Sequence, residues 1–566
     1  MTDHKIEEKE RSKRIQLEIA TFRNKKELGL HSITDKLSIK MSFPSKKVYD
    51  RLAESLKSTF HIEHEVLPKD EEQEKDEYLQ DEPIEKKDNS KAPPVLYFSY
   101  YDYDEILRFF TEEHEDVSFE PIPPFVFQVL DHYENQIKSF KNKSKKSPKD
   151  YDLSLRLPSN LYNNILPFQK EGIEYAISRD GRVMLCDEMG LGKTLQALGI
   201  ASFYPKEWPM LIIGPCSLHN NWRRELNTWI DAEWLKKHMG KEFNFTGDSL
   251  DPYICIVDSS QGLAKVIEET RENPKKYLVY IISYDLASKN AEDENSDAVK
   301  WLLDFSIIIT DESHMLKNDG SKRTQNIIPL LRSAKRLVLI SGTASPSRPI
   351  ELFTQMKALL CGPKSKKTLL KKTEFGYRYC DLKTNFFTGA DYRGNRFLSE
   401  LNLLLSRSIM IRRLKRDVLT QLPPKRRYLT YLSLPDEDIG PHRLTFENFN
   451  QRKGKNLRFD PNDIEILQKF NLTAIAKQKT VARYARYTFK KGEKFIIFAH
   501  HRSVMNAIEE EIKKEIEEVE KNEGKKLKFV RIDGETPVEQ RHAISQEFRE
   551  DPDVKVAILS IAVAGM

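Results

Sequence analysis

The sequence predicts an α/β protein built around two open parallel sheets, and two observations carry this prediction. Short apolar runs rich in β-branched residues alternate with helical patterns between RVMLC (Arg182–Cys186) and RLVLISG (Arg336–Gly342). The same alternation resumes between Lys494 and Ser560. Buried parallel strands that are covered by helices produce this rhythm.

Length and composition bound the remaining possibilities. A chain of 566 residues is long enough for about three or four domains. Its 92 basic and 87 acidic residues nearly cancel, to a net charge of +5, although they are gathered in separate blocks. The five cysteines show neither a zinc-type spacing nor a disulfide framework, which favours a reducing compartment. The charged N-terminus and the strand-length apolar runs favour a soluble, intracellular protein with no membrane partner.

The N-terminal third is predicted to be less structured than the rest. Residues 1–94 read as a charged, largely disordered tail, because Pro68–Lys91 carries ten acidic and five basic residues and almost nothing to bury. Within it, Glu8–Arg23 is either a frayed surface helix or a basic amphipathic helix that docks on a partner. Residues 95–137 form a small accessory module. Residues 138–157 form a basic linker, in which the six lysines of Lys138–Lys149 are a solvated run, a nuclear-import signal or a DNA-backbone patch.

The stretch CDEMGLGKTLQAL (Cys186–Leu198) resembles a phosphate-binding loop in which Asp187 stands where the first glycine is usual. A strand precedes it and a helix follows, so backbone N–H groups at the helix start can bind an anion. Lys193 can neutralise phosphates and the Thr194 hydroxyl can bind Mg²⁺. The alternative is an ordinary glycine-containing turn with a surface lysine. The ATP-binding set is predicted to be Asp187, Glu188, Met189, Gly190, Leu191, Gly192, Lys193 and Thr194.

A pair of carboxylates follows the strand-like run of FSIIITDESH (Phe305–His314), 118 residues after Lys193. Asp311 at the end of such a strand can hold hydrated Mg²⁺. Glu312 can then orient and activate the attacking water of a phosphoryl transfer. In isolation the two residues would be read as solvated charge. With the phosphate loop upstream, we predict Lys193, Asp311 and Glu312 as the catalytic residues.

The ordered motifs along the chain resemble those of the Swi/Snf-type ATPases of superfamily two, closest to the annealing-helicase branch. They are Gln169, DEMGLGKT, GPCSLHNNW (Gly214–Trp222), ISYDL (Ile282–Leu286), DESH, SGTASPSRPIELF (Ser341–Phe353), IMIRRLKRDVLTQLPPKRR (Ile409–Arg427), FIIFAHHRSVM (Phe495–Met505) and IDGETPVEQR (Ile532–Arg541). The resemblance implies two RecA-like lobes: lobe 1 at residues 158–357, helical protrusions and a basic interlobe linker at 358–480, and lobe 2 at 481–566. It also suggests a HARP-like identity for residues 95–137.

Residue roles follow from the resemblance. Gln169 is expected to read adenine, and Ser341, Gly342 and Thr343 to link ATP to DNA contacts. The expected coupling and DNA-contact residues are Arg412, Arg413, Lys415, Arg416 and Arg541. The run Gly362–Lys372 adds five lysines that could contact the DNA phosphate backbone, and the alternative is a solvated helical face. Because the sequence stops at Met566, an incomplete second lobe without the family's paired arginines, and hence impaired hydrolysis, is expected.

The function that the resemblance implies is an ATP- and Mg²⁺-dependent DNA translocase of the nucleus, which rewinds or remodels branched DNA at stalled replication forks. Its expected partners are fork DNA, both duplex and single-stranded, with a single-stranded-DNA-binding protein or a sliding clamp as candidate protein partners. A nucleosome-remodelling ATPase and a non-catalytic DNA-binding protein are the alternatives.

Overall fold

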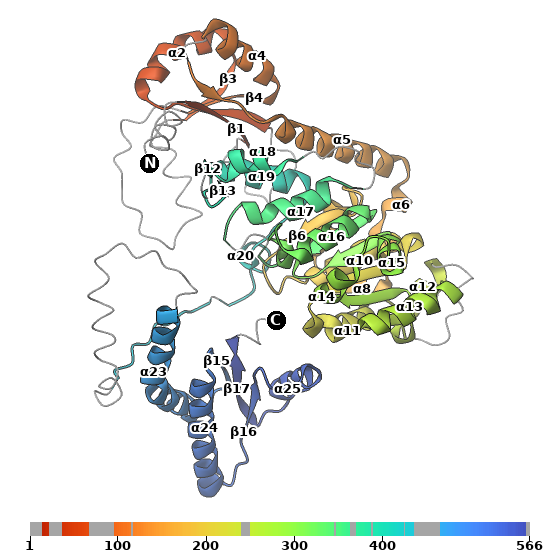
Figure 1. Ribbon diagram of the computed structural model, residues 1–566, viewed down its shortest axis with the longest axis vertical. Coiled ribbons are helices and arrows are strands. Elements are labelled where there is room, and N and C mark those ends of the chain that lie inside the picture. The colour runs from red at the N-terminus through yellow and green to blue at the C-terminus, as the bar shows by residue number, and fades with distance from the viewer. Residues whose placement is uncertain are drawn as a thin grey trace. The chain divides into compact units, whose positions relative to one another are not determined.

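The computed structural model describes residues 14–21, 37–66, 95–114, 117–238, 249–274, 276–343, 347–362, 370–385, 389–423, 425–434 and 464–561. The chain divides into two compact units, Met1–Gln421 and Leu422–Met566, which are described separately below (Figure 1). Within the described residues, no helix combines the length and the apolar character needed to cross a lipid bilayer.

A seven-stranded parallel sheet forms the centre of the first unit, in the order β14-β6-β11-β10-β7-β9-β8. The sequence-predicted strands of this region are confirmed, whereas the edge strand β14 was not predicted. The strands are β6 (Arg182–Leu185), β7 (Met210–Gly214), β8 (Ile254–Val257), β9 (Val279–Ser283), β10 (Ile307–Thr310), β11 (Arg336–Ile340) and β14 (Met410–Ile411).

Helices cover both faces of this sheet, and alternate strand residues enter two different cores. Val183 packs in one apolar cluster and Met184 in the other, and the same holds for Ile212 and Leu211. This alternation is the period of two that a strand imposes. The helices of this region are α8 (Ser159–Asn164), α9 (Pro167–Ile177), α10 (Lys193–Ser202), α11 (His219–Trp229), α12 (Ala232–His238), α13 (Ser260–Glu272), α14 (Tyr284–Asn290), α15 (Asp297–Leu303), α16 (Lys322–Ser333) and α17 (Ile350–Leu360).

The prediction of a largely disordered N-terminal tail is wrong for the described residues. Together with residues 95–114 and 117–120 they form a five-stranded sheet in the order β3-β4-β2-β1-β5. Its strands are β1 (Ile15–Thr21), β2 (Leu37–Ser42), β3 (Ile62–Val66), β4 (Val95–Ser99) and β5 (Phe119–Glu120), and its helices are α2 (Lys46–Thr59) and α4 (Tyr103–Arg108). The predicted helix in Glu8–Arg23 is also corrected: Ile15, Leu17 and Ile19 alternate with polar or small residues, and all three are buried in a strand. The acidic run Pro68–Lys91 lies outside the described residues.

The predicted basic linker at residues 138–157 is mostly helical. Helix α5 (Pro124–Lys146) runs through most of the lysine-rich stretch and is followed by α6 (Pro148–Tyr151) and α7 (Leu153–Arg156). The ring of Phe140 meets that of Tyr151 at 5.1 Å, and both pack against the core around α10. Apolar positions on one face of α5, such as Val129 and Tyr133, are buried, which explains why a lysine-rich helix is held in place.

The N-terminal sheet is joined to the rest of the first unit along β1, at the residues after Gln16 that β5 does not pair. Arg378 of α18 (Lys372–Tyr379) donates from Nη2 to the carbonyl of Leu17 at 2.7 Å. Glu400 of α19 (Leu398–Ser408) accepts from the N–H of Ile19 at 2.9 Å. Arg378 and Glu400 are themselves paired at 2.6 Å and both are buried. These side chains satisfy backbone groups that an exposed strand edge would leave open. The predicted boundary at residue 94 therefore divides one sheet.

The second unit contains the three remaining predicted strands. They form a parallel sheet in the order β15-β17-β16, and the elements are α23 (Ile464–Lys490), β15 (Phe495–Ala499), α24 (Arg502–Glu523), β16 (Lys528–Ile532), α25 (Val538–Glu550) and β17 (Val554–Ser560). The predicted boundaries at 357 and 480 fall inside α17 and α23. The helical region expected between them also contains a hairpin, β12 (Lys383–Asn385) with β13 (Gly389–Asp391), and the short helix α20 (Lys415–Val418).

Candidate nucleotide site

The loop between β6 and α10 has the geometry of an anion-binding loop. Gly190 and Gly192 have φ angles of 83° and 69°, in the left-handed region that favours glycine. A Cβ at Gly192 would lie 2.3 Å from Nε2 of Gln169, so a larger residue would have to displace that side chain as well as adopt a left-handed φ. Helix α10 begins directly at Lys193, which directs free N–H groups of its first turn toward the loop.

The side chain of Lys193 folds back over the loop that it follows. Its Nζ donates to the carbonyl of Asp187 at 2.9 Å and contacts that of Glu188 at 3.4 Å. Burial lowers the pKa of Lys193, and the carboxylates of Asp187, Glu312 and Asp311 act in the opposite direction. A phosphate would add negative charge where this ammonium is incompletely solvated, so the site fits a nucleoside polyphosphate.

The contacts of Asp187 give a structural role to an aspartate at the position where a glycine is usual. Its carboxylate is fully buried and forms a two-pronged ion pair with Arg413, at 3.0 Å from Nε and 2.6 Å from Nη2. It also accepts from the Arg413 backbone N–H and from Nε2 of Gln196, each at 2.9 Å. Arg413 additionally donates to Gln196 and to the carbonyl of Phe168. The side chain of Arg413 is 5% exposed and is paired with Asp187, and its expected role in coupling and DNA contact stays a prediction.

The two carboxylates after β10 occupy different environments. Asp311 accepts from Nε1 of Trp222 and from the backbone N–H of Glu312, both at 2.9 Å, and burial raises its pKa. Glu312 has a left-handed backbone with φ 52°, which is uncommon for a residue other than glycine and marks a constrained position. Its Oε2 lies 3.1 Å from Nδ1 of His314, and the same nitrogen lies 3.2 Å from Oγ of Ser341.

Sheet topology brings these groups together. Strands β6, β11 and β10 are neighbours and parallel, so the loops after them share one edge of the sheet. Accordingly, a Cβ at Gly342 would lie 2.8 Å from Cγ of Met189 and 3.9 Å from Nζ of Lys193. Thr343 donates from its N–H to Oγ of Ser341 at 3.1 Å. The predicted loop, carboxylates and hydroxyl residues therefore lie together in the structure. Their carboxylate and hydroxyl oxygens are ligands that suit Mg²⁺.

Gln169 lies in the first turn of α9 rather than before it. Its Oε1 accepts from the N–H of Leu166 at 2.8 Å, and its Nε2 donates to the carbonyl of Leu191 at 3.0 Å. An amide oxygen can accept a second hydrogen bond and an amide nitrogen can donate a second one. The expected adenine contact of Gln169 therefore stays a prediction.

The expected DNA-contact residues are only partly gathered. Arg412 and Arg416 are exposed near β14, whereas Lys415 is half-buried. Arg541 belongs to the second unit, where its Nε donates to the carbonyl of Thr536 at 3.1 Å. Most of the lysine run within Gly362–Lys372 lies outside the described residues. The roles of these residues in DNA contact stay predictions.

Three residues that organise the site had no role in the sequence-based prediction. Trp222 donates to Asp311, His314 bridges Glu312 and Ser341, and the hydroxyl of Tyr284 donates to the backbone carbonyl of Asp311 at 2.8 Å. All three belong to stretches that had been recognised as motifs. Their position within these motifs was the only sequence signal for their role, because no spacing rule predicts which side chain contacts the carboxylates.

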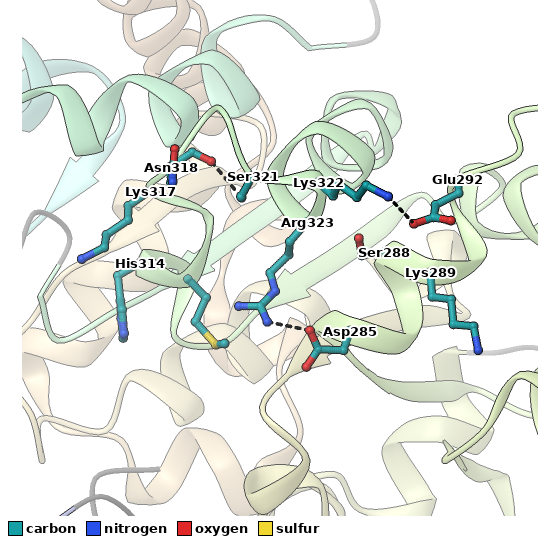
Figure 2. Close-up of a pocket in the computed structure, with 11 residues that line it drawn as sticks. Asp285, Ser288, Lys289, Glu292, His314, Lys317, Asn318, Ser321, Lys322 and Arg323 are labelled. Atoms are coloured by element: carbon teal, nitrogen blue, oxygen red, sulfur yellow. Dashed lines mark hydrogen bonds and ion pairs between the residues drawn. The ribbon is translucent and has the colours of Figure 1, made fainter. Parts of the chain in front are cut away.

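An open cavity of about 540 Å³ lies beside the carboxylates, between α14, the turn after β10 and the start of α16 (Figure 2). Three of the four lysine and arginine side chains that line it have carboxylate partners. Arg323 pairs with Asp285 at 2.6 Å, Lys322 with Glu292 at 3.9 Å and Lys317 with Glu351 at 3.8 Å. The phosphate loop does not line this cavity. The cavity is therefore distinct from the candidate nucleotide site, and His314 lies at its edge (Figure 2).

Fold and site together define a parallel α/β lobe of the phosphate-loop, nucleotide-binding class. The SNF2-related domain family matches residues 168–483, which is more than half of the chain, and the chain belongs to this family.

Individual relatives support this assignment. The chain is 37% identical over 420 residues to the SWI/SNF-related matrix-associated actin-dependent regulator of chromatin subfamily A-like protein 1 of Xenopus laevis, covering 74% of this chain and 38% of the relative. It is 37% identical over 421 residues to the DNA annealing helicase and endonuclease ZRANB3 of Bos taurus, covering 72% and 35%. The chain therefore spans less than two fifths of the length of these relatives.

One solved structure, the Sulfolobus solfataricus SWI2/SNF2 ATPase core in complex with dsDNA, is 20% identical to the chain. Its TM-score is 0.34, and the match covers 70% of this chain and 78% of that one. We draw nothing further from a similarity this low.

Proposed function

We propose that this protein is an ATP- and Mg²⁺-dependent DNA translocase that rewinds or remodels branched DNA at stalled replication forks in the nucleus. The observation that carries the proposal is the constellation at the carboxyl edge of the seven-stranded sheet. There a glycine-containing loop and Lys193 adjoin Asp311 and Glu312. Glu312 is in turn linked through His314 to Ser341. Membership of the SNF2-related domain family, and similarity to a chromatin regulator and to a DNA annealing helicase, support the choice of DNA as the partner.

ATP hydrolysis requires positioning and charge stabilisation more than covalent chemistry. The loop N–H groups and Lys193 bind the phosphates, and Thr194 and Asp311 supply oxygen ligands for Mg²⁺. When bound, Mg²⁺ neutralises developing negative charge on the phosphates. Glu312 is the group placed to orient and deprotonate the attacking water.

Coupling to DNA is proposed to run through His314. A change in the orientation of Glu312 when nucleotide binds would alter its contact with His314, and through it the position of Ser341. Ser341 begins the segment that continues to Gly342 and Thr343 after β11. This gives a short covalent and hydrogen-bonded route between the hydrolytic carboxylate and a loop on the same sheet edge.

The test is DNA-stimulated ATP hydrolysis by the full chain, compared with Glu312→Gln. Removing a general base costs about 10²- to 10⁴-fold in rate, so the variant should lose stimulated turnover yet still bind ADP. Fork DNA should stimulate more strongly than linear duplex of equal length, and should be rewound in a strand-annealing assay. Stronger stimulation by nucleosomes, with sliding, would support a remodeller instead. DNA binding without any stimulated turnover would indicate a non-catalytic DNA-binding protein.

A further inference from the structure

The segment that follows β14 runs alongside the first half of the phosphate loop. The N–H of Cys186 donates to the carbonyl of Ile411 at 2.8 Å, and that of Glu188 donates to the carbonyl of Arg413 at 2.9 Å. One step further, the N–H of Lys415 donates to Oε2 of Glu188 at 2.7 Å. The ladder of the sheet thus continues past the strand ends, and the buried Asp187–Arg413 ion pair fixes the two segments together.

This pairing carries the side chain of Lys415 over the loop. A Cβ at Gly190 would lie 3.3 Å from Nζ and 3.4 Å from Cε of Lys415. Lys415 as a residue is half-buried, and among the described residues its ammonium group has no carboxylate within ion-pair distance. Its exposed neighbour Arg416 instead lies 3.6 Å from Asp417. A cation that lies over an anion-binding loop and has no carboxylate partner favours the binding of an anion there.

We propose that Lys415 is a second cation of the nucleotide site, which contacts a phosphate of the bound nucleoside polyphosphate from the Gly190 part of the loop. Lys193 approaches from the start of α10, so the phosphates would lie between cations from two distant segments of the chain. Charge-assisted contacts of this kind are the strong ones in a site that is sheltered from water. This inference rests on the proposed function, because it requires that the loop bind a nucleotide.

The same lysine was expected from the sequence to contact DNA, and the two roles differ in what its removal does. If Lys415 contacts the nucleotide phosphates, its removal should weaken the binding of ADP and ATP and leave the binding of adenosine unchanged. If Lys415 contacts the DNA backbone, its removal should lower the affinity for DNA and the salt dependence of that affinity, and leave ADP binding unchanged. Arg416 provides a matched control, because it is the next residue in the sequence and carries the same charge but is exposed.

The experiment measures binding to the full chain of Mg²⁺-ADP in the absence of DNA, of adenosine by competition, and of a DNA duplex in the absence of nucleotide. The variants are Lys415→Ala, Lys415→Arg and Arg416→Ala. Lys415→Ala should weaken ADP about tenfold, the usual effect of losing one charge-assisted contact, with adenosine unchanged. Lys415→Arg should recover part of the loss, and Arg416→Ala should bind ADP like the unmodified chain.

Each other outcome overturns the inference. If Lys415→Ala binds ADP as tightly as the unmodified chain, the lysine is not a phosphate ligand. If ADP and adenosine weaken equally, or if Arg416→Ala weakens ADP as much, the effect is not a phosphate contact of Lys415. A failure of the unmodified chain to bind ADP would instead refute the proposed function itself, so the two failures are distinguishable.

Discussion

Replacing Arg413 with methionine should destabilise the first unit strongly, because it leaves the Asp187 carboxylate buried without its cation. Breaking a buried ion pair by removing one partner costs about 3–5 kcal/mol. Two donors to Asp187 survive the change, the backbone N–H of residue 413 and Nε2 of Gln196, both at 2.9 Å. These keep the expected loss near the lower end, at about 3 kcal/mol.

Tryptophan fluorescence in urea is the assay, because all five tryptophans, Trp208, Trp222, Trp229, Trp234 and Trp301, belong to the first unit. With a urea dependence of about 3 kcal/mol/M, a loss of about 3 kcal/mol lowers the midpoint by about 1 M. The exposed neighbour provides the control: Arg412→Met should leave the midpoint unchanged, because surface substitutions usually change stability by less than about 0.5 kcal/mol.

A double variant separates stability from positioning. Asp187→Leu combined with Arg413→Met replaces the ion pair with apolar side chains, which is often neutral for stability when the volume is kept. The double variant should recover most of the midpoint but not the ADP affinity, because the carboxylate no longer fixes the loop to Arg413. An unchanged midpoint in Arg413→Met would show that the ion pair contributes little. Full ADP affinity in the double variant would show that it does not position the loop.

Three further outcomes are expected. Lys193→Met should abolish stabilisation by ADP in a thermal shift. Burial lowers the pKa of Lys193, so the charged side chain destabilises the folded state at pH values below that pKa. This cost disappears as the pH rises above the folded-state pKa. Without nucleotide at pH 7, Lys193→Met should therefore be no less stable than the unmodified chain. Glu400→Gln leaves Arg378 buried without its carboxylate, and should increase hydrogen exchange in β1 while ADP binding persists, at a cost of about 3 kcal/mol. Arg412→Ala with Arg416→Ala should weaken duplex DNA binding and reduce its salt slope by about 1.8, with ADP affinity unchanged; an unchanged slope would remove both arginines from the DNA interface.

Sequence reasoning predicted the strands of the two parallel sheets because fully buried strands appear as unbroken apolar runs. It missed β14, which has only two residues and is followed at once by a basic run. It also missed the N-terminal sheet, since composition averaged over residues 1–94 hid short alternating strands between charged stretches. Ile15, Leu17 and Ile19 show the period of two that a residue-by-residue reading would have detected.

The candidate site was predictable where a motif implies its own backbone geometry, as at Gly190 to Thr194. It was not predictable where a side chain finds its partner across the fold. Arg413 and Arg416 lie three residues apart in one basic run, yet the first is buried and the second exposed. A count of positive charge treats them alike, whereas their roles depend on Asp187, 226 residues away in the sequence.

The aspartate at the start of the phosphate loop is therefore part of the design of the site. A glycine there would match the usual pattern, but it would leave the Arg413 guanidinium buried without a carboxylate. The ion pair also fastens the loop to the last segment of the first unit, which leads into the second unit after Gln421. Any displacement of the loop on binding phosphates must then be shared by the residues around Arg413 and Lys415. The departure from the usual motif gives the candidate nucleotide site a direct ion-pair connection to the last segment of the first unit.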